Sequence, residues 1–299
     1  MKDKKNTYYV LMTALVVVWG IDYVVVKLAL GLLEPLSVLF FKYIAAFLLV
    51  LPVKLRMDGR GLIRKEDIWL YVLCVIFGEI IYYFCEYKAM DYLPVSLISI
   101  IVAFTPAVSV IFERVIYKKR VTLKIIAGIA VCVLGVALII GVDIGALLNG
   151  KLIGYLLAFI CIFAWNAYNF ITFALRDGYT TVTLTLNQII CTLLLLSPYM
   201  AYTARDLPGF THVLVLQLLF LGLFNSGVGF LIFVEALHVL GPTATVLFSN
   251  FIPVTTTIFG WFFLKETISP LQAAGGVIVI LAGYIVIKEK GKTEVYAGV

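Results

Sequence analysis

The chain has 299 residues, of which 63% are hydrophobic and 13% are charged. A composition this apolar excludes an ordinary soluble domain and is typical of a protein that crosses a membrane several times. The basic residues behind the net charge of +6 lie mostly in short loops beside apolar segments, where cations set the orientation of membrane helices. We therefore expect a lipid bilayer as partner and no nucleic acid.

Ten segments are apolar over about 20 residues, the length that a helix needs to cross the hydrocarbon core of a bilayer. They cover residues 8–29, 36–53, 68–87, 93–116, 122–142, 152–174, 183–203, 213–236, 243–264 and 270–287. The sequence therefore predicts an all-α polytopic membrane protein with ten transmembrane helices. The basic start resembles a signal peptide, but no small-residue cleavage site follows it, so we expect the first segment to be retained.

Ionisable and aromatic side chains concentrate in the first three segments. The candidates for a substrate site there are Trp19, Asp22, Tyr23, Lys42, Glu79, Tyr82, Tyr83 and Glu86. An ionisable residue in the hydrocarbon is energetically costly and normally faces a cavity or a charged partner. By contrast, we expect Lys27 and Lys88 to extend toward the membrane surface.

The stretch Ala89–Ile140 is repeated as Ala236–Ile287 after a shift of 147 residues. Identical pairs include Phe104 and Phe251, Pro106 and Pro253, and Gly128 and Gly275. We therefore predict two copies of one five-helix unit, residues 1–149 and 150–299. Because five is odd, the second copy enters the membrane from the opposite side, and the repeats are inverted as in many secondary transporters.

The second copy carries amides and aromatic residues where the first carries charges. Its candidates for substrate contact are Trp165, Asn166, Asn169, Asn225 and Asn250. Buried amides need hydrogen-bond partners, so these asparagines serve either substrate binding or contacts between helices. Pro106 and Pro253 lie mid-span in equivalent segments, where each removes a backbone hydrogen bond and predicts a kink. Paired interruptions of this kind point to a transport pathway.

The distribution of Lys and Arg predicts how the chain is oriented. With the N-terminus in the cytoplasm, most of these residues fall on the inner side, in residues 2–5, 54–65, 114–124 and 288–292. Outside the membrane on the other face lie Lys151, Arg205 and Lys265. This positive-inside pattern predicts that both termini are cytoplasmic, and we expect the plasma membrane as the location.

The sequence contains no motif for a nucleotide, a metal ion or a catalytic nucleophile. Its five cysteines all lie within apolar segments and do not show the spacing of metal ligands. We expect no cofactor, no metal site and no enzymatic activity.

Several stretches resemble the EamA-type ten-helix exporters of the drug/metabolite transporter superfamily. They are VVVWGIDYVVVKLAL (16–30), FFKYIAAFLL (40–49), YKAMDYLPVSLISIIVAFTPAVSVIF (87–112) and most of 235–287. Leu264–Thr267 is similar to the family's L-G-E-R/T turn, and Lys42 stands where the family usually has arginine before an aromatic residue. The equivalent turn of the first copy departs from the pattern, with Lys118 and Lys119. The resemblance implies a central cavity between the halves, lined by spans 1, 3, 4, 6, 8 and 9, and the export of amino acids or other small metabolites.

From the residues and this resemblance we predict a secondary transporter that exports amino acids or similar small polar metabolites by alternating access. In this hypothesis Asp22 and Glu79 face the amine of a zwitterionic substrate, and Lys42 faces its carboxylate. Protons are a candidate coupling ion through Glu79, and facilitated diffusion or exchange fits equally well. The alternatives are a lipophilic-cation exporter, a membrane-embedded lipid-modifying enzyme and a non-transporting partner subunit. The oligomeric state stays open.

Overall fold

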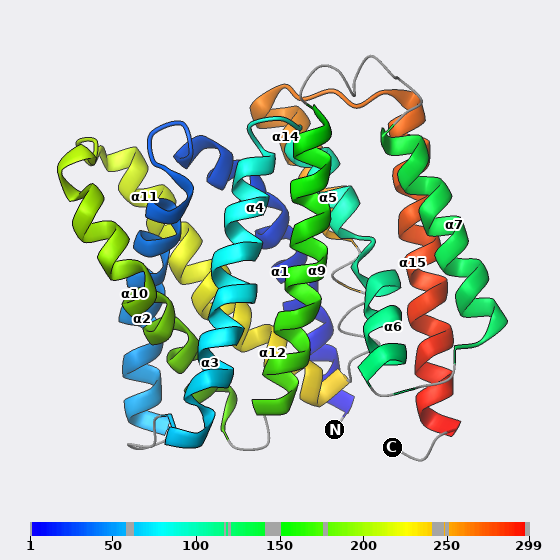
Figure 1. Cartoon of the computed structure of the whole chain (residues 1–299), viewed down its shortest axis with the longest axis horizontal. Helices are drawn as coiled ribbons and strands as arrows, with labels where there is room; N and C mark the ends of the chain where they lie inside the picture. The colour runs from blue at the N-terminus through cyan, green and yellow to red at the C-terminus, as the bar shows by residue number, and fades with distance from the viewer. Residues whose placement is uncertain are drawn as a thin grey trace.

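The computed structural model describes residues 2–57, 63–116, 118, 121–140, 151–175, 179–240, 248 and 251–296, and all regular structure within them is helical. The helices stand side by side as one bundle, and both chain termini lie at the same end of it (Figure 1). We call this end, which also holds residues 63–67 and 179–180, the terminal end. The opposite end, which holds residues 30–34, 90–94 and 265–269, is the far end.

The all-helical prediction is confirmed, and each predicted segment contains an apolar helix. The first half comprises α1 (Lys2–Ala29), α2 (Pro35–Met57), η1 (Lys65–Asp67), α3 (Ile68–Cys74), η2 (Val75–Ile81), α4 (Tyr82–Ala89), α5 (Val95–Val102), α6 (Thr105–Ile116) and α7 (Leu123–Ile140). The second half comprises α9 (Lys151–Leu175), α10 (Thr181–Thr203), η4 (Ala204–Asp206), α11 (His212–Phe220), η5 (Leu221–Gly229), α12 (Phe230–Leu240), α14 (Ile252–Leu264) and α15 (Pro270–Tyr296). Within the described ranges, eight spans are long and apolar enough to cross a membrane, and α7 and α14 are shorter apolar helices.

Two of these spans change their winding in the middle. The span built from α3, η2 and α4 is continuous, as is the span built from α11, η5 and α12, and both central segments are π-helical. A shift of 147 residues moves η2 onto positions 222–228, which lie inside η5. A π-helical turn inside an α-helix is rare and often marks a functional site.

The fourth predicted span is interrupted. Its first helix, α5, ends at Val102, a turn at 103–104 follows, and α6 begins at Thr105. Pro106 is therefore the second residue of α6, and Pro253 is likewise the second residue of α14. Proline is well tolerated in the first helical turn, where its missing N–H would have no partner within the helix. Both prolines thus stand at helix starts.

The helices α7 and α15 lie against each other at one edge of the bundle (Figure 1). A Cβ built on Gly135 would meet the carbonyl of Gly275, and a Cβ built on Gly275 would meet the carbonyl of Gly135. One helical turn away, Cys132 Sγ lies 3.8 Å from the carbonyl oxygen of Val279. Small residues let the two backbones approach closely, which is a common way for membrane helices to associate.

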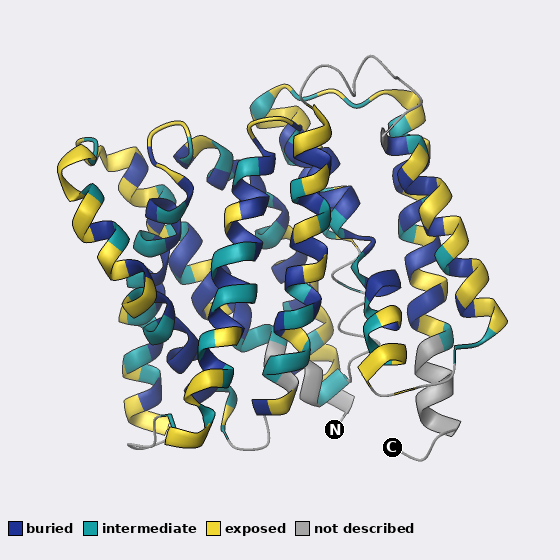
Figure 2. Ribbon diagram, in the orientation of Figure 1, coloured by how far each residue is buried: buried dark blue, intermediate teal, exposed yellow. Residues whose placement is uncertain are grey.

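Buried side chains follow the inward faces of the helices, while the outward faces of the peripheral helices are exposed and apolar (Figure 2). On α7, for example, Leu123 and Leu134 are exposed, as expected for side chains that face lipid. The interior is not purely apolar. Asp22, Lys42 and Glu79 are buried among the hydrophobic residues of α1, α2 and η2, and they identify the region of interest.

Candidate functional site

Four ionisable side chains are buried together in the first half of the bundle. They come from four different helices and are at most 6% exposed: Asp22 from α1 (6%), Lys42 from α2 (0%), Glu79 from η2 (2%) and Glu86 from α4 (4%). The charges of all three acids act on Lys42. We call these four residues the charged cluster. A buried charge is tolerated when it is paired and hydrogen-bonded, so the surroundings of each member decide what the cluster can do.

Lys42 lies in a cage of tyrosines. Its Nζ is 3.5 Å from the ring centroid of Tyr83 and 5.6 and 5.8 Å from those of Tyr43 and Tyr87. The same nitrogen donates a hydrogen bond of 3.2 Å to the hydroxyl of Tyr87. An ammonium group over an aromatic face is stabilised by the quadrupole of the ring, and more strongly where water is excluded. The cage is therefore suited to a positive charge in the interior.

Tyrosine hydroxyls also serve the two glutamates. The hydroxyl of Tyr43 donates to Glu79 Oε2, and the hydroxyls of Tyr23 and Tyr82 each donate to Glu86 Oε1 at 2.8 Å. Hydrogen bonds to a carboxylate are stronger than those between neutral groups, and they stabilise the ionised form. The cluster thus contains two acids with fixed partners.

Asp22 is less well satisfied. Its Oδ1 is buried and has no hydrogen-bond partner, although the side chain of Asn225 from η5 lies next to the carboxyl group. The neighbouring Ser226 Oγ is also buried without a partner. An unsatisfied buried polar atom costs free energy, so both atoms have free capacity to bind a polar group of a ligand. Here the second half of the chain meets the charged cluster.

A small cavity lies beside the charged cluster. It has a volume of about 10 Å³ and is lined by Tyr43, Glu79, Thr185, Gln188, Ile189, Ser226 and Phe230. This volume is close to the minimum for a single water molecule. Both halves contribute to its wall, with Glu79 from the first half and Ser226 from the second.

Aromatic residues border the cluster on two sides. Trp165 packs against Tyr82, with ring centroids 5.0 Å apart, and stacks on Tyr168 at 4.9 Å. Trp19 packs against Phe233 at 5.4 Å, and its indole nitrogen is buried without a partner. Each tryptophan therefore packs against an aromatic residue of the other half of the chain.

Two of the remaining predicted asparagines lie on α9. Asn166 is buried, but its Nδ2 donates to the carbonyl of Ile162 on the same helix at 2.8 Å. Asn169 is exposed on α9 and lies outside the charged cluster. Asn250 lies outside the described residues. Of the predicted amides that the structure describes, Asn225 is the one that lies next to an acid.

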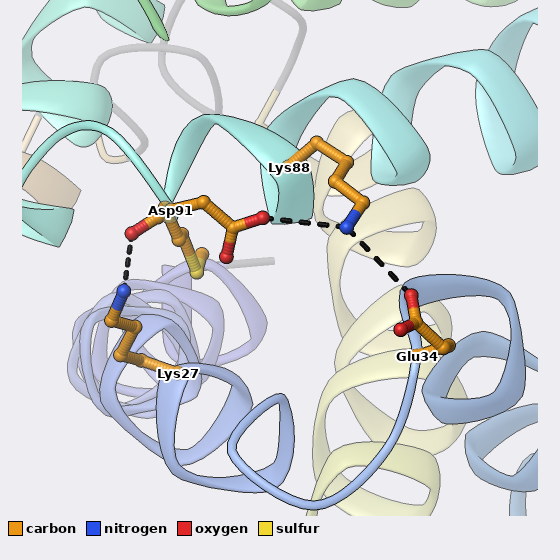
Figure 3. Close-up of polar contacts among 5 residues, drawn as sticks. Lys27, Glu34, Lys88 and Asp91 are labelled. Atoms are coloured by element: carbon orange, nitrogen blue, oxygen red, sulfur yellow. Dashed lines mark hydrogen bonds and ion pairs between the residues drawn. The ribbon is translucent and has the colours of Figure 1, made fainter. Parts of the chain in front are cut away.

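Lys27 and Lys88, which were expected to extend outward, form polar contacts with residues of the far end (Figure 3). Lys88 Nζ lies 3.4 Å from Asp91 Oδ2 and 3.7 Å from Glu34 Oε2, and Lys27 donates to the carbonyl of Met90. Lys88, Asp91 and Glu34 border an open cavity of about 580 Å³ that also touches Tyr199. These ties connect the α1–α2 turn with the end of α4.

A second polar network was missed by sequence reasoning. Gln188 from α10 accepts from Tyr168 at 3.1 Å and donates to Cys74 Sγ at 3.1 Å and Thr172 Oγ1 at 3.3 Å. A Cβ on Gly78 would fall on the ring of Tyr168, so η2 can approach α9 only because that residue is glycine. The depth of Gln188 in an apolar segment was the available signal. In the part of the chain that the structure describes, no three His, Cys, Asp or Glu side chains gather as metal ligands.

Comparison with known proteins agrees with this architecture. The sequence profile of the EamA-like transporter family matches residues 6–141 and 152–288. A protein of Archaeoglobus fulgidus named an uncharacterized transporter is 23% identical over 282 residues, which cover 94% of this chain and 99% of the relative.

Two further relatives carry a more specific name. A probable amino-acid metabolite efflux pump of Salmonella typhimurium is 24% identical over 90% of this chain and 91% of its own length. Another of that name, from Escherichia coli, is 23% identical over 92% of this chain and 93% of its own length. A solved crystal structure with 18% identity superposes with a TM-score of 0.62 over 92% of this chain and 98% of that chain, so the two share a fold.

Proposed function

Because the chain belongs to the EamA-like transporter family, we propose that this multi-pass membrane transporter exports amino acids or similar small polar metabolites by alternating access. The observation that carries the proposal is the charged cluster, which buries three acids and one lysine beside the boundary between the halves. A zwitterionic solute offers both charges that such a cluster can bind.

The arrangement of the cluster supports an order of contacts. Asp22, with its unsatisfied Oδ1, and Glu79, at the wall of the small cavity, are placed to receive the ammonium group of a substrate. Lys42 then receives the carboxylate, because its ammonium group has a single side-chain hydrogen bond, to Tyr87, among the described residues. Three acids exceed one lysine, so an added positive charge improves the electrostatic balance of the site.

The names of two relatives support amino acids as the substrate class, since both are called probable amino-acid metabolite efflux pumps. The excess of acids over lysine and the tyrosine rings favour a second candidate, a lipophilic cation. A cation of this kind would use the acids and aromatic faces and leave Lys42 without a counterpart.

Backbone features support two copies of one unit. The helices α2 and α10 both have 23 residues, and a shift of 146 residues aligns Pro52 inside the first with Pro198 inside the second. Lys118 and Lys265, aligned by the shift of 147, have φ angles of 54° and 57° and are the two non-glycine residues with positive φ in the described chain. Independent local features thus recur at equivalent positions.

The packing of α7 on α15 supports an inverted relation between the copies. A Cβ on Gly128 would meet Val286, and a Cβ on its repeat-equivalent, Gly275, would meet Ile139, which is equivalent to Val286. Reciprocal contacts of this kind are the mark of a two-fold relation. Since α7 and α15 run antiparallel here, the axis lies across the helices, as in transporters with inverted repeats.

The proposal includes a location and an orientation. We place the protein in the plasma membrane with both termini in the cytoplasm, in line with the positive-inside pattern. Protons are a candidate coupling ion because Glu79 and Asp22 are buried carboxyl groups next to the boundary between the halves. A reporter fused after residue 292 tests the orientation, and periplasmic activity of that reporter would contradict it.

The substrate class is tested by binding and flux with the purified full-length protein. Amino acids, nucleosides and quaternary amines are screened by thermal shift, because a ligand that binds the folded state raises the melting temperature. A hit is then followed as exchange in liposomes, with and without a pH step. We expect an amino acid to bind and exchange. Stabilisation by quaternary amines alone would replace the proposal with the lipophilic-cation exporter.

A further inference from the structure

The helix α5 begins without a local cap. Its N-cap residue is Pro94, whose side chain has no atom that could accept a hydrogen bond from the first N–H groups of the helix. The first turn of α5 is nonetheless satisfied. Its acceptor comes from the other half of the chain, about 170 residues away.

Glu266, in the turn after α14, supplies that acceptor. Its Oε1 accepts from the backbone N–H of Val95 at 2.9 Å, and its Oε2 accepts from the N–H and the hydroxyl of Ser96 at 3.2 and 2.9 Å. A carboxylate at a helix N-terminus is favoured both by these hydrogen bonds and by the helix dipole. One side chain of the second half thus accepts three hydrogen bonds from one helix of the first half.

The chain around Glu266 is shaped for this contact. Lys265 adopts a left-handed conformation with φ of 57°, which ends α14 and turns Glu266 back so that its N–H donates to the carbonyl of Gly260. A Cβ built on Gly260 would lie 2.8 Å from Ser96 Oγ and 2.9 Å from Glu266 Oε2. A side chain at position 260 would therefore displace the carboxylate from α5.

We infer that Glu266 is a positioning residue that holds the far end of the transporter closed between α5 and α14. The inference rests on the proposed alternating access, in which the halves separate at one end at a time. Because α5 and α14 belong to different halves, opening the far end between them breaks the three bonds of Glu266. By sequence alone, the shift of 147 aligns Glu266 with Lys119, a residue with hydrogen-bond donors only, so the two copies do not carry the same closure.

The test measures opening without a substrate. Ser99, one turn deeper in α5, is 3% exposed, and a Ser99→Cys variant of the full-length protein in detergent serves as a reporter for alkylation by a small polar maleimide. Labelled peptides are quantified by mass spectrometry. Adding Glu266→Gln or Gly260→Ala should raise the labelling rate at position 99 about tenfold, the change expected for loss of a charge-assisted hydrogen bond. Ser96→Ala, which removes the hydroxyl donor alone, should raise it less.

Controls separate closure from general loosening. Cys74 and Cys132 are fully buried away from this contact, so their labelling should not change in the same samples. Glu66→Gln, at an exposed acid of the terminal end, makes the same charge change and should leave position 99 protected. Unchanged labelling at 99 in Glu266→Gln, or a parallel rise at Cys74 and Cys132, would overturn the inference. Failure of the substrate screen leaves this readout intact, because the labelling requires no substrate.

Discussion

The two π-helical segments share a backbone and differ in chemistry. In the first half, η2 carries Glu79 and leads into Glu86, both of which belong to the charged cluster. In the second half, η5 carries Asn225 and Ser226 at the matching depth, and the shift of 147 places Ser226 on Glu79. The two segments thus share π-helical winding, and the first carries an ionisable residue where the second carries serine.

The same contrast holds for the neighbouring helices. A shift of 146 residues aligns Asp22 with Tyr168 and Lys42 with Gln188. Asp22 and Lys42 interact through their charges, whereas Tyr168 and Gln188 share a neutral hydrogen bond of 3.1 Å. The aligned positions are therefore charged in the first half of the chain and neutral in the second, and we call these the charged half and the neutral half. Glu79 and Gln188 line the same small cavity, so the charged cluster lies next to neutral polar groups.

The largest expected effect comes from removing the only cation of the cluster. Lys42→Met leaves Asp22 and two glutamates buried without a counterion, and we expect a loss of about 3–5 kcal/mol in the free energy of unfolding. The matched change in the neutral half, Gln188→Met, should cost about 1–3 kcal/mol, since it leaves polar groups unsatisfied but no charge. Unfolding in detergent, followed by tryptophan fluorescence, measures both. Equal losses would show that the contrast between the halves is not electrostatic.

A second test concerns the glycine that lets η5 approach α2. A Cβ on Gly222 would lie 2.5 Å from Ala45 Cβ and 3.1 Å from the backbone nitrogen of Ala46. Gly222→Ala should therefore destabilise the protein by about 1–3 kcal/mol through overpacking. Gly209→Ala is the control, because a Cβ there meets nothing within 4 Å. The melting temperatures of the two variants measure this effect. An unchanged melting temperature in Gly222→Ala would argue against close contact between η5 and α2.

The charged half should also dominate ligand affinity. Asp22→Asn is expected to weaken binding of an amino acid about tenfold, since one charge opposite the ammonium group is lost. Tyr168→Phe, at the aligned position of the neutral half, should change the dissociation constant by less than about twofold. Isothermal titration with the amino acid found in the screen measures both constants. A larger change of the dissociation constant in Tyr168→Phe than in Asp22→Asn would indicate that the substrate binds to the second half.

The smallest effect is expected for the ion pairs of Lys88 at the far end (Figure 3), which are exposed to solvent. Lys88 pairs with Asp91 and Glu34, whose side chains are 52% and 70% exposed. Exposed pairs contribute about 0–1 kcal/mol, so Lys88→Met should leave the melting temperature nearly unchanged. Thermal unfolding at low and high salt checks this expectation. A loss as large as that of Lys42→Met would mean that these ties are part of the protected interior.

Much of the candidate site could be found in the sequence. Asp22, Lys42 and Glu79 stand out because ionisable residues are rare in apolar segments, and the structure places all three in one cluster. Tyr87 could have been added, since it follows Tyr83 by one helical turn. Tyr43 could not, because adjacent residues on a helix point about 100° apart, and only the packing of α2 against η2 brings its hydroxyl to Glu79.

The helical class, the number of apolar segments and the likeness of the two halves were determined by the sequence itself. The reason is local, because a chain in lipid must satisfy its backbone hydrogen bonds within each segment, and apolar length alone reports this. The tertiary structure decided which polar groups meet. Asp22, Glu86 and Asn225 come from distant helices, and their distances depend on how those helices pack. The contact of Glu266 with α5 was decided in the same way, since it joins two segments about 170 residues apart.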